Sequence, residues 1–183
     1  TIDNYNFDQK RALIRVDFNV PLNQALEVTD ATRIKAAIPT IKKVLESGGS
    51  VVLMSHLGRP KSGPEDKFSM RHIVSTLEKE LGTEVTFVPD CVGKEANAVT
   101  SQMKPGQVVL LENLRFYPEE TAGDEFFAGQ LAEHGDCYIN DAFGTAHRAH
   151  ASTTVVARFF PEDKMFGLLL STELESMDKV LNS

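Results

Sequence analysis

Short apolar segments that end in polar and cationic residues recur along this chain of 183 residues. The clearest is the segment 51–60, VVLMSHLGRP, in which a serine, a histidine, a glycine and an arginine closely follow the apolar run. The same layout begins at Arg15, Val108 and Cys137. Ligands of parallel α/β sheets bind outside the carboxyl ends of the strands. Four polar strand ends therefore predict one shared site, with an anion as its ligand.

Strands and helices are expected to alternate along the chain. Strands are predicted at residues 12–16, 50–54, 84–88, 107–111, 136–140 and 166–170. Helices are predicted after Asp30, from 69 to 81, 93 to 103 and 124 to 134, and less clearly over 153–160 and 171–181. This alternation predicts βαβ units, a parallel sheet and helices on both of its faces. The length and the 42% hydrophobic content suit one domain over residues 1–183.

Composition excludes some classes of function. A net charge of −7 argues against a general nucleic-acid binder, which usually has a basic face. No apolar stretch approaches the roughly 20 residues of a membrane span, and residues 1–10 lack the apolar region of a secretory signal. Cys91 and Cys137 fit no metal spacing and are interpreted as buried thiols. We therefore expect a cytoplasmic protein.

Four arginines stand out against this acidic background. Arg59, Arg115 and Arg148 each follow a predicted strand, and Arg33 lies in the first turn of the helix after the first strand. A guanidinium is a flat, permanently charged group that binds phosphate or carboxylate through two hydrogen bonds. Converging arginines would therefore bind a polyanion. Three other arginines are interpreted as surface residues: Arg11, Arg71 and Arg158.

Polar and imidazole side chains accompany these arginines. Asp17 and Asn19 follow the first strand and can hydrogen-bond a substrate hydroxyl, although Asp17 could instead be the structural partner of an arginine. Three of the five histidines, His56, His147 and His150, lie in the same predicted loops.

A metal site and a nucleotide site are both disfavoured by the motifs. His56, Asp141, His147 and His150 could in principle hold a metal ion, but Arg148 lies between two of the histidines and no HExxH motif occurs. We expect no metal here. Neither GxxxxGK[ST] nor GxGxxG occurs, so nothing is expected to cradle a nucleoside triphosphate. The sequence thus predicts a site for an anionic phosphoryl acceptor without a site for the donor.

Five segments together resemble one family. RVDFNVP, TRIKAAIPTI, SHLGRP, LLENLRF and NDAFGTAHRAHAS are similar, in order and spacing, to the amino-terminal domain of phosphoglycerate kinases. The resemblance implies a Rossmann-like three-layer α/β/α sandwich with a mostly parallel, about six-stranded sheet. It implies glycolytic phosphoryl transfer, with 3-phosphoglycerate or 1,3-bisphosphoglycerate as ligand. Mg-ADP or Mg-ATP would bind a separate carboxy-terminal domain of the same enzyme, which is expected to be a monomer.

The resemblance also implies roles for residues at the first two strand ends. Asp17 and Asn19 match positions that hydrogen-bond the hydroxyl and carboxyl end of the glycerate. Arg33 matches the arginine that reaches toward the transferred phosphoryl group, which makes it the expected catalytic residue. His56 matches a substrate-binding position beside the phosphate-binding arginines.

Those arginines are Arg59, Arg115 and Arg148, which match the basic patch that binds the phosphate of 3-phosphoglycerate. His147 and His150 flank Arg148 and are expected to support the patch.

The chain stops where the resembled family continues into its nucleotide-binding domain, so we expect it to bind 3-phosphoglycerate without turning over. Two alternatives stay open: a free-standing binding module for small phosphorylated acids, and a metal-dependent hydrolase that uses the histidine cluster.

Overall fold

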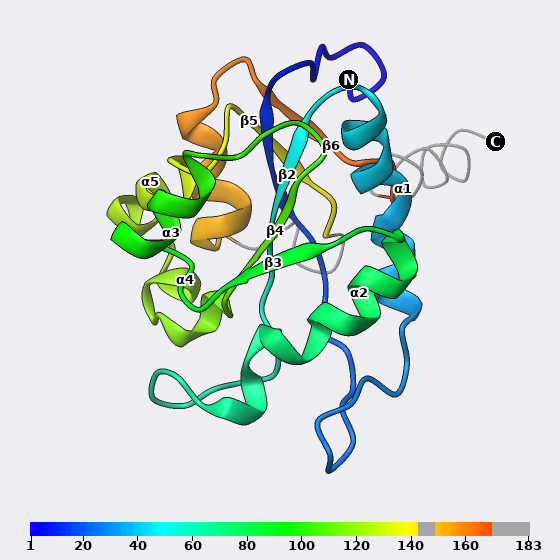
Figure 1. The fold of residues 1–183 in the computed structure, drawn as a ribbon. Coiled ribbons are helices and arrows are strands. Elements are labelled where there is room, and N and C mark those ends of the chain that lie inside the picture. Colours follow the sequence, from blue (N-terminus) through cyan, green and yellow to red (C-terminus); the bar gives the residue numbers. More distant parts are fainter. Residues whose placement is uncertain (143–148, 170–183) are drawn as a thin grey trace, which may run out of the picture.

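A six-stranded parallel sheet forms the centre of the protein (Figure 1). The computed structural model describes residues 1–142 and 149–169. The strand order is β3-β4-β2-β1-β5-β6, and every pair of neighbours is parallel. The strands are β1 (Arg11–Arg15), β2 (Ser50–Met54), β3 (Val85–Val88), β4 (Val108–Leu111), β5 (Cys137–Asn140) and β6 (Lys164–Phe166).

Helices cover both faces of the sheet, so the predicted three-layer α/β/α sandwich is confirmed (Figure 1). One face carries α1 (Thr32–Glu46) and α2 (Val74–Leu81). The other carries α3 (Lys94–Thr100), α4 (Glu119–Ala122) and α5 (Glu125–Ala132). Short helical turns complete the structure: η1 (Asp66–Phe68), η2 (Met70–Ile73), η3 (Leu114–Phe116), η5 (Ala151–Val155) and η6 (Val156–Phe159).

The central strands β1, β2, β4 and β5 are buried on both faces because their side chains alternate between two apolar cores. In β1, Ile14 belongs to the core under α1 and α2, together with Ile41 and Leu77. Leu13 belongs to the core on the opposite face, where Phe127 of α5 packs. This double burial explains why the strands are continuous apolar runs instead of alternating ones.

Helix ends follow the predicted signals with small shifts. The Asp30 carboxylate accepts a hydrogen bond from the backbone N–H of Thr32 at 2.9 Å, at the start of α1. Ser69 caps a 3₁₀ turn, η2, and the α-helix begins only at Val74. Gly82 ends α2 in the left-handed conformation, with φ at 71°.

The region after residue 150 departs most from the sequence prediction. The predicted helix over 153–160 begins earlier, at Ala151, as a π turn that continues into a 3₁₀ turn. The sixth strand is Lys164–Phe166, not residues 166–170. At the next residue, Gly167, the chain passes tightly against Asp141, and a Cβ atom there would lie 2.3 Å from that carboxyl. The helix predicted over 171–181 lies outside the described residues.

Candidate anion-binding site

The carboxyl ends of the four central strands, β1, β2, β4 and β5, are joined by hydrogen bonds. The hydroxyl of Ser55, directly after β2, accepts from the backbone N–H of Phe18 at 2.9 Å. The carbonyl of Ser55 accepts from Leu114 N–H at 3.1 Å, and the carbonyl of Arg15 accepts from Asp141 N–H at 2.9 Å. The loops after β1 and β2 lie together at the lower edge of the view in Figure 1.

Asp17, Asn19 and Arg33 form one connected group at this edge. Arg33 Nη1 lies 3.3 Å from Asp17 Oδ1 and donates to the Asn19 carbonyl at 2.9 Å. The Asn19 side-chain oxygen accepts from Gly58 N–H at 2.8 Å, which ties the first loop to the second. Because the Arg33 side chain is 55% exposed, its ion pair with Asp17 contributes little stability and can exchange for a ligand. Asp17 thus has an arginine partner, and its hydrogen bond to a substrate hydroxyl stays a prediction.

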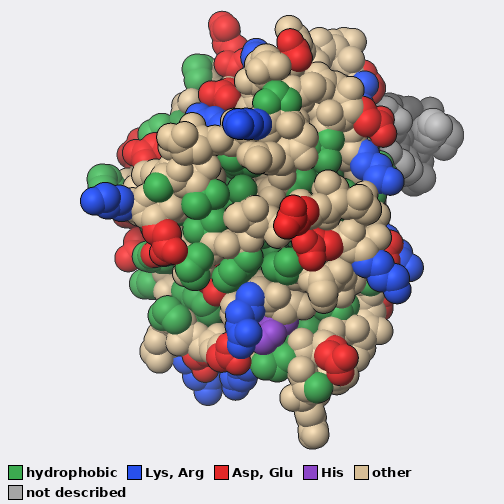
Figure 2. All heavy atoms as spheres, viewed as in Figure 1, with side chains coloured by type: hydrophobic (Ala, Val, Ile, Leu, Met, Phe, Trp, Pro, Cys, Tyr) green, Lys and Arg blue, Asp and Glu red, His purple; other side chains and the backbone are tan. Residues whose placement is uncertain are grey.

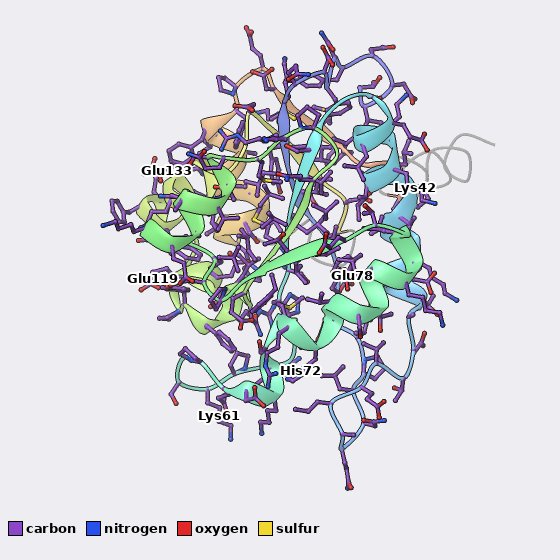
Figure 3. All side chains as sticks on the ribbon, in the orientation of Figure 1. Lys42, Lys61, His72, Glu78, Glu119 and Glu133 are labelled. Carbon is purple, nitrogen blue, oxygen red and sulfur yellow. The ribbon has the colours of Figure 1, made fainter. Side chains whose placement is uncertain are left out.

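Arg59 and Arg115 line one cavity of about 480 Å³. Arg59 is exposed and Arg115 is partly buried. Lys61 and Tyr117 line the same cavity, and Figure 3 labels Lys61 on the loop that follows β2. Three cationic side chains around one cavity suit a phosphate or carboxylate group, since charge-assisted hydrogen bonds are the stronger ones.

The two loops that carry these arginines are joined by Asn113, which is fully buried. Its amide nitrogen donates to the carbonyls of Leu57, at 2.7 Å, and Phe68, at 2.9 Å. Its side-chain oxygen accepts from the backbone N–H of Arg115 at 3.0 Å. The neighbouring Glu112 accepts from the Ser69 hydroxyl at 2.6 Å. Glu112 and Asn113 lie in the segment LLENLRF, but the sequence alone predicted no role for them.

His56 is 5% exposed and contacts the buried side chain of Arg15, a residue that the sequence reasoning did not single out. Arg15, the last residue of β1, places Nη2 3.0 Å from His56 Nδ1. Burial, together with the positive charges of Arg15 and Arg115, lowers the pKa of His56 to about 2. His56 is thus neutral near pH 7 and adds no positive charge to the site. An arginine at the end of an otherwise apolar strand was the available signal for Arg15.

Comparison with known proteins assigns the family. The family model described as phosphoglycerate kinase matches residues 2–183. The chain belongs to the phosphoglycerate kinase family. The phosphoglycerate kinase of Moorella thermoacetica is 51% identical over 99% of this chain and 45% of its own length. That of Porphyromonas gingivalis is 45% identical over 100% of this chain and 49% of its own length.

Solved phosphoglycerate kinases have the same fold. The enzyme from Pyrococcus horikoshii superposes with a TM-score of 0.89 at 32% identity, covering 99% of this chain and 45% of that structure. The one from Coxiella burnetii gives 0.85 at 36% identity, covering 97% and 43%. The chain spans about half the length of the phosphoglycerate kinases it matches.

The remaining predicted site residues have different outcomes. His150 is 8% exposed and close enough to His56 to contribute to its lowered pKa. Arg148 and His147 lie outside the described residues. Arg11, expected to be a solvated surface residue, instead pairs with Asp136 at 3.3 Å, with its side chain 24% exposed.

Metal and membrane features are absent from the described part of the chain. Over residues 1–142 and 149–169, no group of three or more His, Cys, Asp or Glu side chains could hold a metal ion. Within the same ranges, no helix is long and apolar enough to cross a membrane. Cys91 and Cys137 are buried free thiols, as predicted.

The loop after β2 does not form a cradle for the Mg-nucleotide that the family uses. Gly58 is the glycine in the loop after β2, and a phosphate cradle would need open space above it. A Cβ atom at Gly58 would lie 2.4 Å from the Phe68 ring, so that ring fills the space. Figure 2 shows acidic, basic and apolar side chains interspersed over the face in view, with no continuous basic surface. This loop and the cavity lined by Arg59 and Arg115 therefore suit a small anion better than a nucleotide.

Proposed function

We propose that this chain is the 3-phosphoglycerate-binding half of a phosphoglycerate kinase, with residues 1–183 as one domain. The observation that supports this most is the cavity shared by Arg59 and Arg115. Asn19, which contacts Arg33, is hydrogen-bonded to Gly58, the residue before Arg59. The whole enzyme would transfer a phosphoryl group between 1,3-bisphosphoglycerate and ADP, giving 3-phosphoglycerate and ATP. Mg-nucleotide would bind a part of the enzyme that this chain does not contain.

The phosphate of 3-phosphoglycerate would bind the arginines of the cavity. Arg59 and Arg115 supply fixed positive charge, and Arg148 joins them by resemblance to the family, with His147 and His150 supporting it. Each charge-assisted hydrogen bond contributes about 1.5–3 kcal/mol. Two or three such bonds suffice for selective binding of a dianion.

The glycerate end of the ligand would bind the other group. Because Asn19 uses its side-chain oxygen to accept from Gly58 N–H, its amide nitrogen is the atom that would donate to the ligand carboxylate. Asp17 would accept from the ligand hydroxyl. Arg33, held by exposed contacts with Asp17 and with the Asn19 carbonyl, would move to the acyl phosphate of 1,3-bisphosphoglycerate and stabilise the charge on the transferred group.

Calorimetric titration with 3-phosphoglycerate tests this assignment. Arg115→Ala should weaken binding by roughly tenfold or more, and added salt should weaken it in the wild type. Arg71→Ala is the matched control, because Arg71 is exposed, pairs with Asp66 and does not line the cavity. Equal affinities for wild type and Arg115→Ala would contradict the assignment.

Turnover tests the second half of the proposal. Because the nucleotide is proposed to bind outside residues 1–183, the chain alone should form ATP from 1,3-bisphosphoglycerate and ADP only at the background rate. Robust turnover by the isolated chain would contradict it. We further propose a cytoplasmic location, and a monomer for the whole enzyme.

A further inference from the structure

Arg15 lies completely buried beneath the proposed anion site and reaches three acceptors at once. Nε donates to the Ser152 hydroxyl at 2.8 Å, Nη1 donates to the Val16 carbonyl, and Nη2 faces His56 Nδ1 at 3.0 Å. A guanidinium has only donors and keeps its charge in proteins, so all three partners must accept.

The charge of Arg15 is balanced by Glu120, also fully buried, through the intervening Ser152. The Ser152 hydroxyl donates to Glu120 Oε2, and its backbone N–H donates to Oε1 at 2.9 Å. The hydroxyl hydrogen is therefore directed at Glu120, which leaves the oxygen lone pairs for Arg15. These hydrogen bonds hold the guanidinium of Arg15, at the end of β1, against Ser152 of η5. Nη2 is then the guanidinium nitrogen that faces His56.

The tautomer of His56 follows from this contact. Since Arg15 Nη2 can only donate, His56 Nδ1 must accept, and the ring proton must be on Nε2. A second proton, on Nδ1, would point an N–H group of His56 at an N–H group of Arg15 and bring two positive charges together. The charged groups that bear on the ring from neighbouring elements, Arg15, Arg115, His150 and Arg33, all disfavour the imidazolium.

We propose that Arg15 is a positioning residue that holds His56 neutral, with its proton on Nε2, so that His56 gives an uncharged hydrogen bond to an oxygen of the bound anion. This inference rests on the proposed function, because the anion is taken to be the glycerate ligand. Its consequence is a donor whose strength does not change between about pH 5.5 and 8, the range in which an ordinary histidine titrates.

Nitrogen-15 NMR of the ring in the ligand-free chain tests the state of His56 independently of any ligand. We expect an unprotonated Nδ1, a protonated Nε2 and no titration between about pH 5.5 and 8. A proton on Nδ1, or a midpoint near the usual 6.5, would overturn the proposal. If this pattern holds while 3-phosphoglycerate fails to bind, the proposed ligand is wrong and the link from Arg15 to His56 stands.

Substitution of Arg15 tests the link itself. Arg15→Lys keeps a positive charge but cannot reach three acceptors, so the single-tautomer signature should disappear and affinity for 3-phosphoglycerate should fall roughly tenfold. Arg71→Lys, an exposed arginine paired with Asp66, should change neither. An unchanged His56 spectrum in Arg15→Lys would overturn the proposal.

Substitution of His56 tests the donor even if Arg15→Lys does not fold. The amide of His56→Gln reaches the place of Nε2 and can still donate, whereas His56→Asn keeps an acceptor for Arg15 but loses that donor. We expect His56→Gln to bind 3-phosphoglycerate roughly tenfold more tightly than His56→Asn. Equal or reversed affinities would overturn the proposal.

Discussion

Replacing Asn113 by alanine should destabilise the protein strongly, because one small side chain joins three backbone segments. The substitution removes two donated bonds, to the carbonyls of Leu57 and Phe68, and one accepted bond, from Arg115 N–H. Asn113 is fully buried, so water cannot freely replace these partners. At about 1 kcal/mol for each lost bond, with a partial penalty for the groups left unpaired, the free energy of unfolding should fall by about 2–4 kcal/mol.

Urea unfolding followed by circular dichroism measures this loss, and the slope against urea should stay constant. For a chain of this size, the melting temperature should fall by about 5–15 °C. Asn4→Ala is the control, since Asn4 is exposed and its side chain makes no hydrogen bond with a described residue. A loss below about 1 kcal/mol would refute the reasoning, because the three bonds could then not be holding the loops together.

Two further predictions concern the same loops. Gly58→Ala should destabilise the chain and weaken 3-phosphoglycerate binding, since Gly58 has φ at 63° and a Cβ would lie 2.4 Å from the Phe68 ring; unchanged melting and calorimetry would contradict this. His56 should make the fold acid-sensitive. Its pKa is lowered to about 2 in the folded state, so the unfolded chain binds the extra proton as pH falls below about 6.5. The free energy of unfolding should drop by about 2 kcal/mol from pH 6.5 to 5, and His56→Gln should reduce that drop. The same pH dependence in wild type and His56→Gln would exclude His56 as the cause.

Much of the fold could be predicted because its signals are local. The central strands β1, β2, β4 and β5 are apolar runs followed by polar residues, and each predicted helix has apolar residues at helical spacing. The carboxyl-end rule then correctly brought Asp17, Asn19 and Arg33 into contact, and Arg59 and Arg115 to one cavity. These placements needed only the parallel order of the strands.

The supporting contacts could not be predicted because they join residues far apart in sequence. Arg15 bonds Ser152, which lies 137 positions away, and Asn113 bonds Leu57 across 56 positions. A buried arginine balanced by a distant carboxylate has no signature in periodicity. The close approach of Gly167 to Asp141 likewise appears only in the folded chain.

The most direct test of the central claim is a 3-phosphoglycerate titration of the isotopically labelled chain, followed by backbone amide NMR. The account predicts saturable shifts concentrated at residues 17–19, 56–59 and 113–115, which the structure brings to one sheet edge. No saturable shifts, or shifts centred away from these three loops, would contradict it.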